Sequence, residues 1–192
     1  MAKDLIYLAF NEKSKVIEKA DKIYKKYYGV NYGYNFVDLD IILSKEGIQL
    51  FSANLSIQNI LSTITIDKNF IGIAIDEKLS AEEKNFLVAR ELWYYFYHKS
   101  KGNISGTENL KMKNDDLTIH TEYSIKIQEK TEEAIRADYF AINLLLPEEK
   151  VRNILNMSIF SGVFKDTIEF LVIHFKVPIK IIKMRLYELG YG

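Results

Sequence analysis

The stretch that decides the fold reads Ala89-Arg90-Glu91-Leu92-Trp93-Tyr94-Tyr95-Phe96-Tyr97-His98. It lies in a predicted helix that begins with a capping box, in which Ser80 is the N-cap and Glu83 is the third helical residue. Within this helix Arg90 and Tyr94 are four positions apart, so their side chains lie on one face, one turn from each other. An acid, Glu91, stands between them in the sequence.

These positions are those of a zinc-binding helix, in which His-Glu-x-x-His places two imidazoles one turn apart. Here the two ligand positions hold Arg90 and Tyr94. A guanidinium has a fixed positive charge and no lone pair to offer, and a phenol binds a metal only as its anion. The helix therefore predicts a peptidase scaffold that has lost its catalytic metal. Glu91 is a catalytic residue only if a metal is present, because without one there is no acidified water.

The composition indicates one ordinary globular domain. Of 192 residues, 48% are hydrophobic and 27% are charged, and Lys plus Arg equals Asp plus Glu at 26 each. A chain without net charge has no overall field that draws it to nucleic acid or to an anionic membrane. The absence of cysteine excludes disulfides, a thiol nucleophile and thiolate ligands. Since neither a secretory signal nor a membrane-spanning segment is visible, we expect a cytoplasmic location and no membrane partner.

Hydrophobic periodicity predicts several helices and a small sheet. Helices are expected at 11–28, 36–43, 81–98, 131–146, from 147 onward, at 164–175 and at 178–189, and strands at 48–55, 60–66 and 70–75. The polar stretch 99–129 is predicted to be a long loop or a small flap, a feature that is usually functional or mobile. The predicted organisation is a single domain over 1–192, with an N-terminal helix in 1–34, the sheet and motif helices in 35–147, and a helical tail in 148–192.

Three separated motifs carry a resemblance to a known family. They are the helix around Glu91, the run Ala137-Asp138-Tyr139-Phe140-Ala141-Ile142-Asn143-Leu144-Leu145-Leu146-Pro147, and the ending Arg185-Leu186-Tyr187-Glu188-Leu189-Gly190. In order and spacing they resemble the ImmA/IrrE family of zincin-like metallopeptidases from bacteria, phages and integrative elements. That family reads approximately Ala-His-Glu-Leu-Gly-His-x-x-x-His, then Glu-x-x-Ala-x-x-Phe-Ala-x-x-Leu-Leu-Met-Pro, then Arg-Leu-x-x-Leu-Gly. The resemblance covers about residues 35–190 and implies an α+β, zincin-like fold with a small β-sheet, an active-site helix and a helical C-terminal part.

The resemblance also places the family's metal ligands on residues that do not bind zinc. Its first His falls on Arg90, its second on Tyr94 and its carboxylate ligand on Ala134, although Glu133 is one residue away and can rotate into a similar place. We therefore expect no metal and no cofactor. Our hypothesis is that the Arg90 guanidinium replaces the cation and bonds Glu133 or Glu91, with the Tyr94 hydroxyl completing the network.

Two further positions line the expected cleft. The family's glycine falls on Trp93, whose indole is expected to fill the space, and its trailing His falls on His98. The aromatic run 93–97 is either core packing or a face that binds a partner. His98 and His120 also allow a displaced metal pair with Glu91 or Glu133, but their spacing matches no known site.

The function implied by the resemblance is that of a catalytically inactive, protein-binding regulator, whose partner is a helix-turn-helix repressor of a phage or mobile element. Binding through the cleft and the 99–129 loop is expected to sequester that repressor without cutting it. One alternative is a zinc-dependent endopeptidase with a rearranged site built from Glu91, His98 and Glu133. Another is a DNA-binding regulator that uses the basic tail, namely Lys176, Lys180, Lys183 and Arg185. The neutral chain makes direct nucleic-acid binding the weaker reading.

Overall fold

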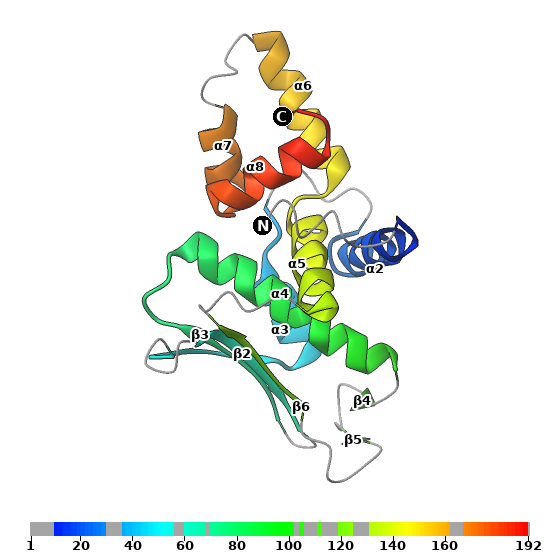
Figure 1. Ribbon diagram of the computed structural model, residues 1–192, viewed down its shortest axis with the longest axis vertical. Coiled ribbons are helices and arrows are strands. Elements are labelled where there is room, and N and C mark those ends of the chain that lie inside the picture. Colours follow the sequence, from blue (N-terminus) through cyan, green and yellow to red (C-terminus); the bar gives the residue numbers. More distant parts are fainter. Residues whose placement is uncertain are drawn as a thin grey trace.

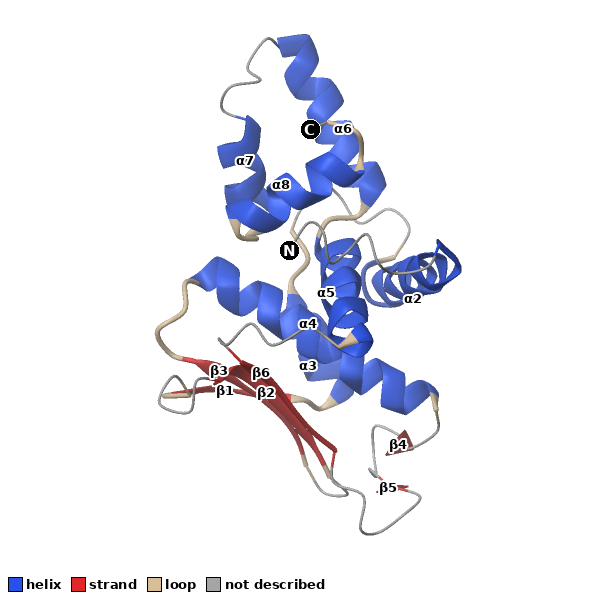
Figure 2. Ribbon diagram, viewed as in Figure 1, coloured by secondary structure: helices blue, strands red, loops and turns tan. Residues whose placement is uncertain are grey.

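The fold combines a small sheet with a larger set of helices, as Figures 1 and 2 show. The computed structural model describes residues 10–29, 36–55, 60–67, 70–101, 104–105, 111–112, 119–124, 131–161 and 167–191. The helices are α2 (Phe10–Tyr28), α3 (Leu39–Glu46), α4 (Ala81–Ser100), α5 (Glu132–Leu145), α6 (Glu148–Ser161), α7 (Thr167–Phe175) and α8 (Ile179–Glu188). The strands are β1 (Gln49–Ala53), β2 (Ile60–Ile66), β3 (Ile71–Asp76), β4 (Ile104–Ser105), β5 (Lys111–Met112) and β6 (Ile119–Ser124). The α+β class expected from the sequence is confirmed.

The main sheet has four strands in the order β1-β3-β2-β6. β1 runs parallel to β3, whereas β2 pairs antiparallel with both β3 and β6. β2 alternates strictly between buried and partly buried side chains, so Ser62, Ile64 and Ile66 point to one buried face. This face packs beneath α4, and the sheet therefore forms the lower layer in Figure 2.

The sequence prediction was wrong for part of the 99–129 stretch. Two short strands, β4 and β5, pair with each other there, and β6 joins the edge of the main sheet next to β2. The β2–β6 register places Thr121 opposite Ile64 and His120 opposite Thr65. β6 pairs with a segment far away in the sequence, and its own residues are mostly polar, so local periodicity gave no strand signal. The predicted loop at 102–103, 106–110, 113–118 and 125–129 lies outside the described residues.

The helices stack on the sheet in layers. α4 lies on the sheet, α5 packs on α4, and α2 packs on α5 (Figure 1). Ala137 and Ala141 of α5 are fully buried, as expected for small residues that let two helices approach closely. α2 contributes Val16, Ala20 and Ile23 to the same core. The sheet on one side and α5 on the other thus bury most of α4, and α2 forms the outer layer on α5.

Helix ends follow the local chemistry of the sequence. The Ser80 side chain accepts from the Glu83 backbone, and the Glu83 carboxylate accepts from the Ser80 backbone, so the predicted capping box is confirmed. α3 begins three residues later than predicted, because Asp38 caps its start, and it stops at Gly47, where the sequence indicated an end and where φ is 67°. That left-handed conformation favours glycine.

Among the described residues, no helix is both long and apolar enough to cross a membrane.

A buried carboxylate joins the first three helices. Glu46, at the end of α3, is 3% exposed and accepts hydrogen bonds from Tyr95 at 2.6 Å and Lys26 at 2.9 Å, and also from Tyr27 and Lys99. Burial alone raises a carboxyl pKa, but the bonds from Lys99, Tyr95 and Lys26 outweigh it and hold the pKa of Glu46 below its ordinary value. The charged form of Glu46 therefore ties α2 and α4 to α3.

The last three helices gather at one end of the molecule, beyond α5 (Figure 2). Pro147 separates α5 from α6, and α8 begins directly after Pro178, in agreement with the sequence prediction. α7 begins at Thr167, while 164–166, where it was predicted to start, lie outside the described residues. Leu171, Phe175 and Ile182 form the buried contacts of this helical part.

Candidate functional site

The candidate site lies where α4 passes between the sheet and α5. Arg90 and Glu91 are 1% and 0% exposed, and the Arg90 side chain is among the largest fully buried ones in the described part of the chain. Burying a guanidinium is unfavourable unless carboxylates and other acceptors surround it. The contacts of Arg90 therefore decide what this site is.

Each edge of the Arg90 guanidinium contacts an oxygen atom. Its Nη1 donates to Glu91 Oε1 at 2.9 Å, its Nε to Asp138 Oδ1 at 3.0 Å, and its Nη2 to the Tyr94 hydroxyl at a longer 3.4 Å. Glu91 Oε1 also accepts from Ser62 Oγ at 2.7 Å. We call these five residues the Arg90 cluster. Because Ser62 belongs to β2 and Asp138 to α5, the cluster joins three structural layers through one cation.

Tyr94 closes the cluster at its partly exposed end. The Arg90 guanidinium carbon lies 5.6 Å from the centre of the Tyr94 ring, within the range of a cation–π contact. Burial, with a further contribution from the carboxylates of Glu91, Glu133 and Asp138, raises the pKa of Tyr94 against the opposing effect of Arg90. The phenol is therefore neutral near pH 7 and does not present the anionic oxygen that a metal requires.

Glu133 does not take the place expected for it. Its Oε1 accepts from the Trp93 indole Nε1, and its Oε2 accepts from Arg136 at 3.0 Å. Of the two carboxylates that the sequence offered as partners of Arg90, Glu91 makes the contact, and Asp138 takes the role considered for Glu133. Ala134, the expected position of the third ligand, lies one turn before Asp138 and donates its backbone N–H to the Thr131 cap.

Trp93 fills space where the resemblance expects glycine. The indole is 5% exposed, and its ring lies 5.6 Å from Phe140 of α5 and 5.9 Å from Tyr97. These contacts place Trp93 in the core between α4 and α5. Most of the aromatic run behaves in the same way, since Tyr95 and Phe96 are also buried.

His98 lies two turns beyond Glu91 on α4. Seven helical residues separate their backbones by about 10 Å. The His98 ring stands edge-on to Tyr97, and burial lowers the pKa of His98 despite the nearby carboxylate of Glu133. His120 lies on β6, but its side chain is outside the described part of the structure, so the displaced His98–His120 pair stays a prediction.

The Arg90 cluster does not fit the zinc ion that the resemblance implies. At the first ligand position a permanently charged guanidinium replaces an imidazole, and it is already bonded to Glu91 and Asp138. At the second position stands the neutral phenol of Tyr94, and at the third the methyl group of Ala134. Across the described residues, no three His, Cys, Asp or Glu side chains are grouped so that they could hold a metal ion.

Two of the four basic residues of the tail, Arg185 and Lys176, make contacts within the fold. Arg185 is 4% exposed and donates to the Leu146 carbonyl at 3.1 Å and to Glu188 at 2.7 Å. Lys176 holds its ammonium 3.6 Å from the centre of the Phe36 ring. Lys180 and Lys183 of this set are exposed on α8, and no such contact is found for them among the described residues. A DNA-binding surface on this tail would thus rest on few charges.

Comparison with known families identifies the family of the chain. The model of the IrrE N-terminal-like domain matches residues 43–187, which is most of the chain and includes every member of the Arg90 cluster. The chain belongs to the IrrE N-terminal-like domain family. The comparison with curated proteins found no match for it. Family membership confirms the resemblance drawn from the three motifs, together with the zincin-like fold that it implied.

The sequence analysis did not identify two members of the Arg90 cluster, Asp138 and Ser62. Asp138 is an acid inside the otherwise apolar run of α5, and an acid at a buried helical position needs a cationic partner. Ser62 is a hydroxyl on the buried face of β2, where it needs an acceptor. Both signals were present in the sequence, but each becomes informative only when the facing residue is known.

Proposed function

We propose that this chain is a non-catalytic member of its family and acts by binding a protein partner. The observation that supports the proposal is the Arg90 cluster, in which a guanidinium and its carboxylate partners lie where the resemblance expects the metal site. Glu91, the residue that would act as general base, accepts hydrogen bonds from Arg90 and Ser62. A carboxylate held in this way, with no metal-bound water to deprotonate, has no peptidase role.

The partner we propose is a helix-turn-helix repressor of a phage or mobile element. This part rests on the resemblance to the ImmA/IrrE peptidases and on no feature of the Arg90 cluster. The chain would bind the repressor and sequester it, leaving the repressor intact. Regulation would then follow from the concentrations of the two proteins and from their affinity.

The first experiment measures metal content in untagged protein after mild loading with zinc, manganese or iron. We expect far less than one ion per chain. A matched variant, Arg90→His/Tyr94→His/Ala134→Glu, supplies the family's donor types at the three positions and is measured in parallel. A stoichiometric metal in the unaltered protein would overturn the proposal.

The second experiment mixes the protein with any helix-turn-helix repressor found to be encoded beside its gene, and follows both by pull-down and by intact mass. We expect a complex in which the repressor keeps its full mass. Truncated repressor that accumulates with time would instead support the endopeptidase with a rearranged site. Neither a complex nor cleavage would reject this repressor as the partner.

A further inference from the structure

A basic groove lies between α2 and α4, away from the Arg90 cluster. It has a volume of about 440 Å³ and is lined by Lys15, Glu18, Lys19, Lys22, Ile23, Phe96, Lys99 and Ser100. Four of these eight residues carry an ammonium group and one carries a carboxylate. The lining residues therefore carry more positive than negative charge, although Glu12 and Glu46, just outside the lining, pair with Lys15 and Lys99.

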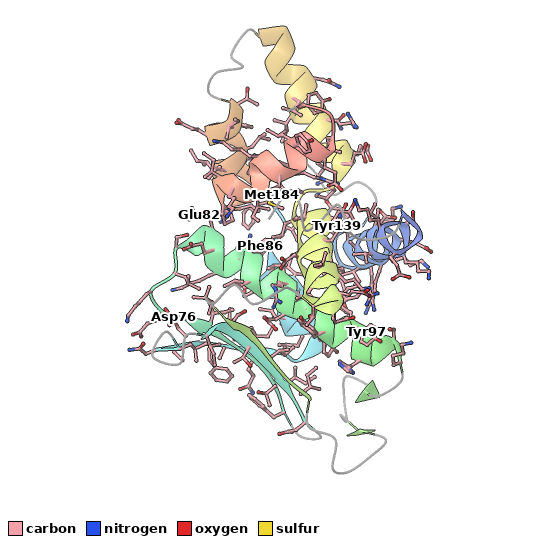
Figure 3. The ribbon with its side chains drawn as sticks, in the orientation of Figure 1. Asp76, Glu82, Phe86, Tyr97, Tyr139 and Met184 are labelled. Carbon is pink, nitrogen blue, oxygen red and sulfur yellow. The ribbon has the colours of Figure 1, made fainter. Side chains whose placement is uncertain are left out.

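Lys19 is held by one hydrogen bond and by two aromatic rings. Its ammonium donates to the Ser100 hydroxyl at 3.2 Å and lies 4.9 Å from the centre of the Trp93 ring and 5.6 Å from that of Tyr97. These contacts join α2 to the C-terminal half of α4, where Figure 3 labels Tyr97. The aromatic rings hold the charge in place, so an ion that binds Lys19 meets a preorganised cation.

The other lysines of the groove have carboxylate partners, whereas the hydrogen-bond partner of Lys19 is a hydroxyl. Lys15 pairs with Glu12 at 3.2 Å, Lys22 with Glu18 at 2.7 Å, and Lys99 with the buried Glu46. Burial, aided by Lys101 and opposed by Glu133, lowers the pKa of Lys19 to about 8. An anion placed in the groove would offset this unfavourable burial of charge.

We propose that this groove binds an acidic peptide segment of the partner protein, with its carboxylates on Lys19 and the neighbouring lysines. Lys15, Lys19 and Lys22 follow one another along one face of α2, and seven helical residues span about 10 Å. An extended peptide advances about 3.3 Å per residue, so this row faces roughly three consecutive residues and suits more than one carboxylate. Charge complementarity thus favours Asp- and Glu-rich peptide over a single small anion. The inference rests on the proposed function, because an acidic docking segment presupposes a protein partner.

The chain contains its own reporter for this site. Trp93 is the single tryptophan, and the Lys19 ammonium lies over its ring, so a ligand that engages Lys19 changes the indole environment. The probe is a synthetic decamer of glutamate, titrated at low salt while Trp93 fluorescence is recorded. We expect a saturable change that weakens as salt is added, and no change with a decamer of glutamine.

Matched variants locate the binding. Lys15→Gln/Lys22→Gln removes two exposed charges from the groove, and Lys180→Gln/Lys183→Gln removes two exposed charges from α8. One exposed ion pair changes affinity by up to about fivefold, so the groove variant should bind the glutamate decamer roughly tenfold more weakly. The α8 variant should bind it as the unaltered protein does. Circular dichroism of both variants checks that they remain folded.

Three results would overturn the inference. They are no fluorescence change with the glutamate decamer, equal weakening in the two double variants, or saturable binding of inorganic tripolyphosphate with none of the peptide. The last result would assign the groove to a phosphate ligand. None of the three alters the metal content or the repressor pull-down, so a failure of the groove is distinguishable from a failure of the proposed function.

Discussion

Arg90 Nε lies 3.0 Å from Asp138 Oδ1, and this contact between two buried side chains joins α4 to α5. With Glu91 on the other side of the guanidinium, one cation faces two carboxylates. These charges stabilise the fold only when all are present, because removing one leaves its partners buried without an opposite charge. We therefore expect the cluster to stabilise the fold, at the place where the resemblance expects a catalytic centre.

Removing the central cation should destabilise the fold strongly. Arg90→Ala leaves Glu91 and Asp138 buried without their shared partner, and breaking a buried pair in this way typically lowers the free energy of unfolding by about 3–5 kcal/mol. Urea denaturation followed by Trp93 fluorescence measures this loss. Tyr94→Phe is the matched control, since it removes only the 3.4 Å contact and should cost less than about 1 kcal/mol. Equal stability of Arg90→Ala and the unaltered protein would show that the cluster does not support the fold.

Removing the three charges of the Arg90 cluster together should lower the free energy of unfolding less than the three separate removals do in sum. The triple variant Arg90→Met/Glu91→Gln/Asp138→Asn leaves no uncompensated charge in the interior. We expect its loss of unfolding free energy to be smaller than the sum of the three single losses, by more than about 1 kcal/mol, because residues in contact are not additive. Strict additivity, measured by urea denaturation of all four variants, would mean that the three charges act independently.

Replacing the three degenerate positions should create a metal site. Arg90→His/Tyr94→His/Ala134→Glu introduces two imidazoles one turn apart on α4 and a carboxylate on the facing helix α5. We expect about one zinc ion per chain by elemental analysis, and a rise in melting temperature when zinc is added. The companion variant Arg90→Gln/Tyr94→Phe, which lacks zinc ligands at both positions, should show neither effect. Zinc bound equally by both variants would place the ion elsewhere.

The Glu46 carboxylate should contribute stability that depends on pH. Its pKa in the folded state lies below the ordinary value of 4.5, so its contribution is present above pH 4.5 and is lost as the pH falls through the folded pKa. Glu46→Gln should therefore destabilise the protein by about 1–3 kcal/mol at pH 7 and by clearly less in acid. Parallel urea denaturation of both proteins at pH 7 and pH 3.5 isolates the effect of this one group. A difference that is the same at the two pH values would contradict the assignment.

Much of the helical framework was predictable because its signals are local. Ser80 and Glu83 cap α4 with side chains that are neighbours in the sequence, and Pro147 separates α5 from α6 by its own geometry. β2 was also predictable, since its alternating apolar residues report a half-buried surface. Elements of this kind depend on residues within a few positions of each other.

The remaining features depend on contacts between distant parts of the chain. β6 is a strand because β2 offers it an edge, and its own mostly polar residues gave no indication of this. Likewise, the roles of Asp138 and Glu46 follow from cations that lie 48 and 53 residues away, respectively. Matching the family motif to this sequence predicted that Arg90 and Tyr94 stand in place of its two histidine ligands. It could not identify Asp138, because in the resemblance that position has no assigned ligand.

α2 packs against α5, although it lies outside the segment that the family model matches. The family match begins at residue 43, so α2 lies wholly before it. Yet α2 covers α5 with Val16 and Ala20 and supplies Glu46 with hydrogen bonds from Lys26 and Tyr27. A fragment cut at the family boundary would expose an apolar surface on its central helices and leave a buried acid with half of its donors. We therefore expect stable folding to require α2 in addition to the segment that the family model matches.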